Sequence, residues 1–70
     1  MYLTTNYEKF KKHLFNMADD YLDLETDSIY TRKEIVNQIN KDSFISAIFD
    51  DCANIYIILT KNNIRRFEIF

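Results

Sequence analysis

The chain has no glycine and no proline among its 70 residues. Phosphate-binding loops of the Walker and Rossmann types need backbone without a Cβ atom, so the absence of glycine excludes these nucleotide-binding motifs. Each tight turn must use another residue that tolerates a positive φ angle, and asparagine is the next best. Asparagine occurs seven times, and several of these residues lie between periodic segments, where turns are expected.

Cysteine, histidine and long apolar runs are also scarce. Cys52 and His13 are each solitary, which excludes an internal disulfide and leaves zinc without most of its ligands. We expect His13 to face solvent on a helix. The longest apolar run, Ile55–Leu59, has five residues, against about 20 in a helix that spans a bilayer. No signal-peptide pattern follows Met1. These absences predict a cytoplasmic protein without a metal or cofactor.

The size of the chain favours one non-enzymatic domain over residues 1–70. Hydrophobic residues make up 47% and charged residues 29%, which is close to the globular average and argues against disorder. A chain of this length hides only about 60% of its unfolded-state surface, so little core is left in which to form a catalytic pocket. We therefore expect a folded protein that is not an enzyme.

Two capping signals mark the starts of helices. The first, Thr5–Glu8, predicts a helix over residues 6–24. The second, Thr31–Glu34, opens a shorter helix that should end near Asn40, which can adopt the left-handed C-cap conformation. Along the first helix, apolar side chains recur at steps of three and four: Tyr7, Phe10, Leu14, Met17, Tyr21 and Leu24.

The carboxyl-terminal part of the chain predicts a β-hairpin. Residues 54–60 and 64–70 are rich in Ile, Tyr and Phe, and Asn62–Asn63 between them suits a two-residue turn. This register gives the hairpin one wholly apolar face: Tyr56, Ile58, Phe67 and Ile69. The other face is mixed: Ile55, Ile57, Leu59, Arg66, Glu68 and Phe70. Because the first strand is apolar on both sides, we expect a further strand on its free edge.

Residues 43–49 decide the fold class. Their β-branched and aromatic residues suit a strand, and their serine spacing also suits a helix. As a strand, they give an α+β fold with two N-terminal helices packed on a C-terminal antiparallel β-meander, which we favour. As a helix, they give three helices plus a β-hairpin, with residues 28–30 as a short strand, which is winged-helix-like.

Acidic side chains are the most uneven feature. Five lie within nine residues that contain no lysine or arginine: Asp19, Asp20, Asp23, Glu25 and Asp27. On the predicted helix they lie at the carboxyl end, whereas Lys9, Lys11 and Lys12 lie at the amino end, opposite to what the helix dipole favours. We expect these carboxylates, with Asp50 and Asp51, to bind a basic surface of a host protein and to mimic nucleic acid there. A solvated helix end is the alternative.

The winged-helix alternative would make the chain a DNA-binding transcription regulator. Arg65 and Arg66 would lie on the wing, and Arg32 and Lys33 at a helix N-terminus. The net charge of −2 argues against this function, because the neutralisation of phosphates supplies most of the affinity for DNA. Direct nucleic-acid binding is therefore not favoured.

The mixed hairpin face is a second candidate surface. Either the rest of the fold covers it, or it binds a partner or a second copy of the chain in a homodimer. We expect at least half of its apolar residues, Ile55, Ile57, Leu59 and Phe70, to belong to the core.

In size, acidity and lack of glycine and proline, the chain resembles the small inhibitor proteins that bacteriophages and mobile elements encode, anti-CRISPR proteins among them. The resemblance implies a cytoplasmic inhibitor in a bacterial host cell. Our leading hypothesis is thus a protein-binding module that inhibits a host protein through its acidic patch.

Overall fold

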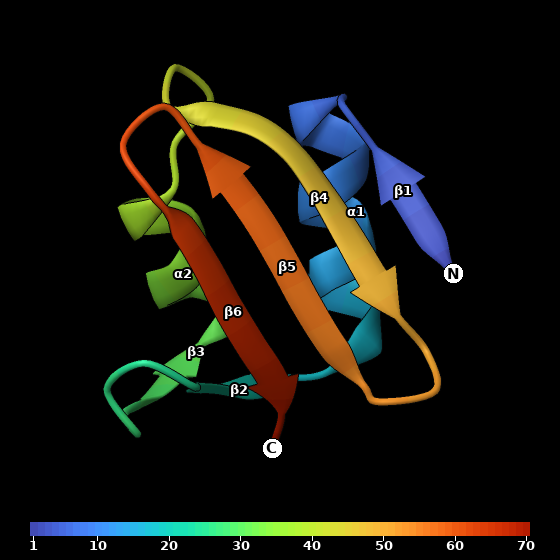
Figure 1. The fold of residues 1–70 in the computed structure, drawn as a ribbon, viewed down its shortest axis with the longest axis vertical. Helices are drawn as coiled ribbons and strands as arrows, with labels where there is room; N and C mark the ends of the chain where they lie inside the picture. Colours follow the sequence, from blue (N-terminus) through green and yellow to red (C-terminus); the bar gives the residue numbers. More distant parts are fainter.

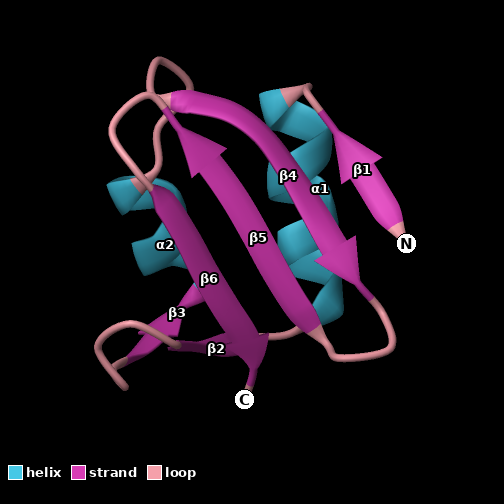
Figure 2. Cartoon of the chain, viewed as in Figure 1, coloured by secondary structure: helices cyan, strands magenta, loops and turns pink.

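Both helices lie on one side of a six-stranded antiparallel sheet in the computed structural model, which describes residues 1–70 (Figures 1 and 2). The strand order in the sheet is β1-β4-β5-β6-β2-β3. Along the chain, the elements are β1 (Tyr2–Thr4), α1 (Tyr7–Met17), β2 (Asp20–Asp23), β3 (Ile29–Thr31), α2 (Arg32–Gln38), β4 (Phe44–Asp50), β5 (Ile55–Thr60) and β6 (Ile64–Ile69).

The predicted α+β class is confirmed, with a correction to the order of its parts. The helices are interleaved with strands and are not strictly N-terminal, since β1 precedes α1 and the β2–β3 hairpin separates α1 from α2. The expected meander is formed by β4, β5 and β6, which pair in chain order. Residues 44–50 are a strand, so the chain lacks the third helix of a winged helix.

The first helix is shorter than predicted. It ends at Met17 rather than near residue 24, and residues 20–23 form β2. Tyr21 and Asp23 are buried in the alternation of a strand, whereas Leu24, the next residue of the predicted helical stripe, is exposed. Pairing with β3 and β6 satisfies the backbone of this segment and replaces the last turns of the predicted helix. The acidic residues therefore do not lie at the end of a helix.

The helix starts are set by local side-chain hydrogen bonds. The predicted N-cap at Thr5 is wrong: Asn6 caps α1, and its side-chain oxygen accepts a hydrogen bond from the Lys9 backbone N–H at 3.0 Å. The start is one residue later because Thr4 belongs to β1 and its hydroxyl accepts from the Asn6 N–H. At α2, the predicted capping box of Thr31–Glu34 is confirmed.

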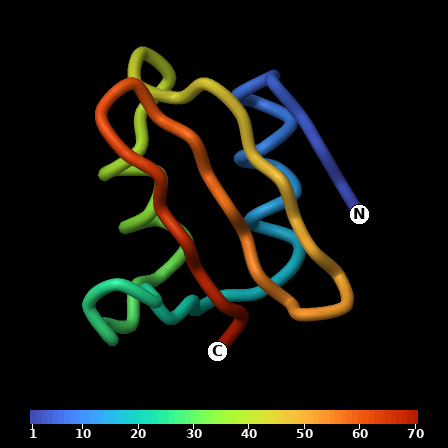
Figure 3. The backbone as a smooth tube through the Cα atoms, viewed as in Figure 1, coloured from blue at the N-terminus to red at the C-terminus, as the bar shows by residue number.

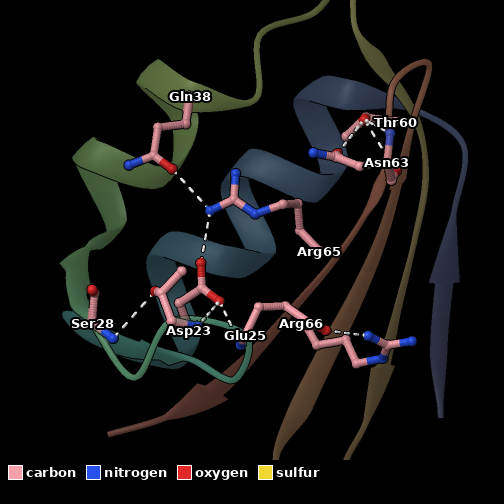
Figure 4. Close-up of polar contacts among 9 residues, drawn as sticks. Asp23, Glu25, Ser28, Gln38, Thr60, Asn63, Arg65 and Arg66 are labelled. Atoms are coloured by element: carbon pink, nitrogen blue, oxygen red, sulfur yellow. Dashed lines mark hydrogen bonds and ion pairs between the residues drawn. The ribbon is translucent and has the colours of Figure 1, made fainter.

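Asparagine replaces glycine in the turns only in part, because one of the two positive φ angles is at an aspartate. Positive φ angles occur at Asp27 and Asn54, with values of 59° and 58°. The β5–β6 loop is wider than the predicted two-residue turn, because the Thr60 hydroxyl organises it by accepting from the backbone N–H groups of Asn62 and Asn63 (Figure 4). At the end of α2, Ile39 is the C-cap, so Asn40 does not supply a left-handed cap.

The wider loop shifts the hairpin register by two residues. Tyr56 pairs with Phe67 and Ile58 with Arg65. An even shift keeps each side chain on its predicted face, because side chains alternate with a period of two. The predicted inward face is therefore confirmed: Tyr56, Ile58 and Phe67 are fully buried, and Ile69 packs against the core.

The core lies between the helices and the inner face of the sheet. Its members include Phe10 and Leu14 from α1, Ile35 from α2, and Tyr56 and Phe67 from the strands. The backbone trace shows β1 alongside β4 at one edge and residues 18–24 passing the end of β6 (Figure 3). Neither helix has the length and apolar composition needed to cross a membrane.

Candidate functional site

The sequence-predicted acidic residues are largely engaged within the protein. Asp19 forms an ion pair with Arg32 at 3.2 Å, and Glu25 forms one with Arg66 on β6 (Figure 4). The sequence alone does not predict these pairs, because their members are far apart along the chain. Glu25 and Arg66 come together only when β2 pairs with β6. Arg66 therefore pairs with Glu25 and not with Glu68, which lies on the same face of β6.

Asp23 is the buried member of the acidic segment. Its side chain is 2% exposed and forms an ion pair with Arg65 at 2.9 Å. The same guanidinium nitrogen of Arg65 donates to Gln38 Oε1, so β2, β6 and α2 share one polar network (Figure 4). Burial acts to raise the pKa of Asp23, but hydrogen bonds from the Glu25 N–H and from Arg65 outweigh it and lower the pKa. Asp23 is thus unavailable to a partner.

The remaining predicted carboxylates serve turns or lie apart. Asp27 occupies the left-handed position of the β2–β3 loop, and its backbone N–H donates to the Asp23 carbonyl. Asp20 is half-buried on β2. Asp50 and Asp51 lie at the β4–β5 turn, and β5 and β6 separate them from β2, a distance of about 14 Å across the sheet. The structure does not bring the seven residues together.

The Asp50–Cys52 turn also brings three potential metal-ligand atoms within 4.8 Å of one another. Asp50 Oδ1 accepts from the backbone N–H groups of Cys52 and Ala53, and Asp51 pairs with the ammonium group of Met1 at 3.5 Å. Both carboxylates therefore already have local partners that account for their positions.

His13 is half-buried and does not face solvent as predicted. Its ring stacks on Tyr2 at a centroid distance of 4.0 Å, and its Nδ1 hydrogen-bonds with the Tyr56 hydroxyl. Burial raises the pKa of Tyr56, which keeps the phenol protonated, so the hydroxyl has a proton that it can donate to Nδ1 of the neutral ring. Burial also lowers the pKa of His13 from 6.5. The ring lies beside a shallow hollow of about 200 Å³ that Lys9 and Lys12 also line.

The largest uncommitted surface is the side of the sheet that faces away from the helices. The helices lie behind the sheet in Figure 1, so this side faces the reader. We call it the outer face. Six aliphatic side chains alternate with buried core residues on β1, β4, β5 and β6 and define it: Leu3, Ile48, Ile55, Ile57, Leu59 and Ile64.

Strand register brings these side chains side by side. Leu3, Ile48 and Ile57 are consecutive neighbours across β1, β4 and β5, and Leu59 lies beside Ile64 on β6. Three of them are exposed, Ile57 to 38% and Ile64 to 49% on the inner strands β5 and β6, and Leu3 to 64% on the edge strand β1. The expectation that half of the mixed face belongs to the core is wrong for β5, because both helices cover the opposite side.

Polar side chains border and interrupt the outer face. Arg66 lies beside Ile57, and Glu68 lies between Ile55 and Leu22 on the neighbouring strands. Arg65, which the winged-helix alternative placed on a DNA-binding wing, instead lies on the helix side and packs over the Phe67 ring at 4.9 Å. Neither arginine is left as a free phosphate-binding group, since both already hold carboxylates.

Comparison of the chain with protein-family models, with curated proteins and with solved structures gives no match.

Proposed function

We propose that this chain is a non-enzymatic protein-binding module that uses the outer face of its sheet. The observation that carries the proposal is the row of aliphatic side chains across β1, β4 and β5, in which Leu3 and Ile57 are exposed and Ile48 is half-buried, and which no helix covers. The largest contiguous apolar patch on a monomer is often its interaction site. Burial of these side chains against another chain would supply the main favourable free energy of binding.

The polar border predicts the chemistry of the partner surface. Glu68 and Asp50 lie at the end of the face near the β4–β5 turn, and Arg66 lies nearer its middle. A complementary surface therefore carries aliphatic side chains at its centre, basic groups against the carboxylates and an acidic group against Arg66. In such an interface the apolar centre gives affinity, and the charges fix the register.

The inhibitor hypothesis is compatible with this function when the outer face, and not the acidic segment, is the surface that binds the host protein. The size and composition of the chain resemble those of phage-encoded inhibitors, so one class of partner is a host protein in the bacterial cytoplasm. The crosslinking experiment is therefore done in bacterial cells. The acidic segment supports that hypothesis less than the outer face does, because Asp19, Asp23 and Glu25 hold this chain's own arginines. Competition with nucleic acid would need those ion pairs to open.

Site-specific photo-crosslinking in bacterial cells tests the proposed function. A benzophenone amino acid at Ile57 reports on the outer face, and the same group at Met17 is the matched control, since the side chains are 38% and 39% exposed. We expect crosslinks to protein from position 57 and few from position 17. Support further requires that the crosslinked protein, once purified, binds the chain and loses at least about tenfold affinity with Ile57→Lys but not with Met17→Lys. Equal crosslinking from both positions would contradict the proposal.

A further inference from the structure

We infer that the protein that occupies the outer face is a second copy of this chain, packed sheet against sheet. This inference rests on the proposed function, because it names the partner of the same surface. Two features of the outer face carry it, namely the order of charges along β6 and the size of the face.

The charges on β6 are complementary to themselves. Arg66 and Glu68 point outward on the same strand, and their neighbours on β5 are Ile57 and Ile55. A two-fold axis that crosses the strands between these two rows places Arg66 of each copy opposite Glu68 of the other. Within one chain Glu68 forms no ion pair, so its carboxylate is available for this contact. Arg66 holds Glu25 through Nη1, and its remaining guanidinium N–H groups are the donors for Glu68 of the other copy.

The same axis matches the apolar side chains of β5. It stacks Ile57 of each copy on Ile55 of the other, and the strands of the two sheets then run antiparallel. Sheets that pack face to face lie about 10 Å apart, a gap that aliphatic side chains fill and that an Arg–Glu pair can span. This symmetric arrangement thus pairs the charged side chains of β6 and the apolar side chains of β5, and on β4 it places Ile48 of each copy opposite Asp50 of the other.

The face is of the size that a dimer needs. The two long axes of the molecule measure 25 and 23 Å between Cα atoms, and the view along the short axis looks onto the sheet (Figure 1). These extents limit the projection of the whole molecule on this side to about 600 Å² before side chains are added, against about 800 Å² of accessible surface per partner in a standard interface. A net charge of −2 per copy gives only weak repulsion between the two.

Molar mass as a function of concentration gives the first test. Sedimentation equilibrium of the wild-type chain from about 1 μM to about 1 mM should show the mass rising from 8.5 kDa to twice that value. Ile57→Lys should stay monomeric throughout, because it buries a lysine against the apolar row, and Met17→Lys should dimerise like the wild type. A wild-type chain that remains at 8.5 kDa at 1 mM overturns the inference.

Charge reversal tests the proposed register, and it does not depend on the Ile57 variant being folded. Arg66→Glu and Glu68→Arg should each weaken the dimer at least about tenfold, because each puts like charges opposite one another. An equimolar mixture of the two variants should regain wild-type association, since acidic positions of one then meet basic positions of the other. Glu25→Gln is the control for the internal ion pair of Arg66 and should not weaken the dimer. A mixture that associates no better than the separate variants overturns the inference.

The crosslinking experiment separates failure of this inference from failure of the proposed function. Crosslinks from position 57 only between copies of the chain support both. Crosslinks only to a different protein, with a wild-type chain that stays monomeric, overturn the dimer and leave the proposed function standing. The absence of any crosslink from position 57 contradicts both.

Discussion

Asp23 is expected on the surface from the sequence, but the fold buries its carboxylate. Its carboxylate is buried and accepts from two backbone N–H groups of the β2–β3 loop as well as from Arg65. A buried charge is tolerated only when such partners replace water. No buried side-chain nitrogen or oxygen in the chain lacks a hydrogen-bond partner, so Asp23 belongs to a fully satisfied interior.

We predict that Asp23→Asn lowers the free energy of unfolding by about 3 kcal/mol, because it leaves the Arg65 guanidinium without its counter-charge. Urea denaturation followed by circular dichroism measures this change. Asp19→Asn is the matched control, since Asp19 also pairs with an arginine but its side chain is 85% exposed. The control should be close to neutral. Equal losses in the two variants would contradict the assigned role of Asp23.

His13 makes the stability of the fold depend on pH below about pH 6.5. Burial lowers the folded-state pKa of His13 below 6.5, whereas the unfolded chain titrates near 6.5. Between these values the unfolded state binds more protons, so stability is complete above pH 6.5 and falls as the pH drops toward the folded-state pKa. Protonation would also place a hydrogen on Nδ1, where the Tyr56 hydroxyl donates.

We predict that the wild-type chain is less stable at pH 5.5 than at pH 7.5 and that His13→Gln removes most of this difference. The glutamine carbonyl can still accept from Tyr56 and does not titrate. Urea denaturation of both proteins at the two pH values, at one protein concentration, provides the comparison. An unchanged pH dependence in His13→Gln would show that another group is responsible.

At the scale of secondary-structure elements, the sequence predicts what local chemistry specifies. The capping box of Thr31–Glu34 and the inward face of the β5–β6 hairpin are both found, because each depends on residues close together along the chain. The strand at residues 44–50 follows from one step of tertiary reasoning, since β5 is apolar on both sides and needs a second neighbour. For the candidate site, the same apolar pattern identified Ile55, Ile57 and Leu59.

The missed elements depend on long-range pairing. Strands β1 and β2 have three and four residues, too few to show an alternating pattern by themselves. Leu3 and Ile48 join the outer face only because β1 pairs with β4 from the other end of the chain. Ion pairs such as Glu25–Arg66 are hidden for the same reason.

We predict that Asn6→Ala lowers the free energy of unfolding by about 1 kcal/mol and that Thr5→Ala does not, because only Asn6 satisfies an orphan N–H group of α1. Thr31→Ala should cost a similar amount through α2. Chemical denaturation of the three variants under one set of conditions checks the order. A larger loss for Thr5→Ala than for Asn6→Ala would restore the capping box first expected from the sequence.

At the scale of the whole molecule, the two helices cover one side of the sheet and leave the other to solvent. A chain of 70 residues has too few elements to cover both sides of a six-stranded sheet. The exposed aliphatic side chains on the outer face therefore follow from the architecture, and a second sheet would complete the layering as in a β-sandwich.

We predict that thermal stability depends on protein concentration, because association through the outer face removes folded monomer from the unfolding equilibrium. Above the dissociation constant, a hundredfold rise in wild-type concentration should raise the Tm by about 5 °C or more. Differential scanning calorimetry across that range measures the shift. Ile57→Lys should melt at one temperature at all concentrations, and Met17→Lys, which adds the same charge on the helix side, should keep the wild-type dependence. A Tm that rises equally in both variants would place the self-association on another surface, since only Ile57 lies on the outer face.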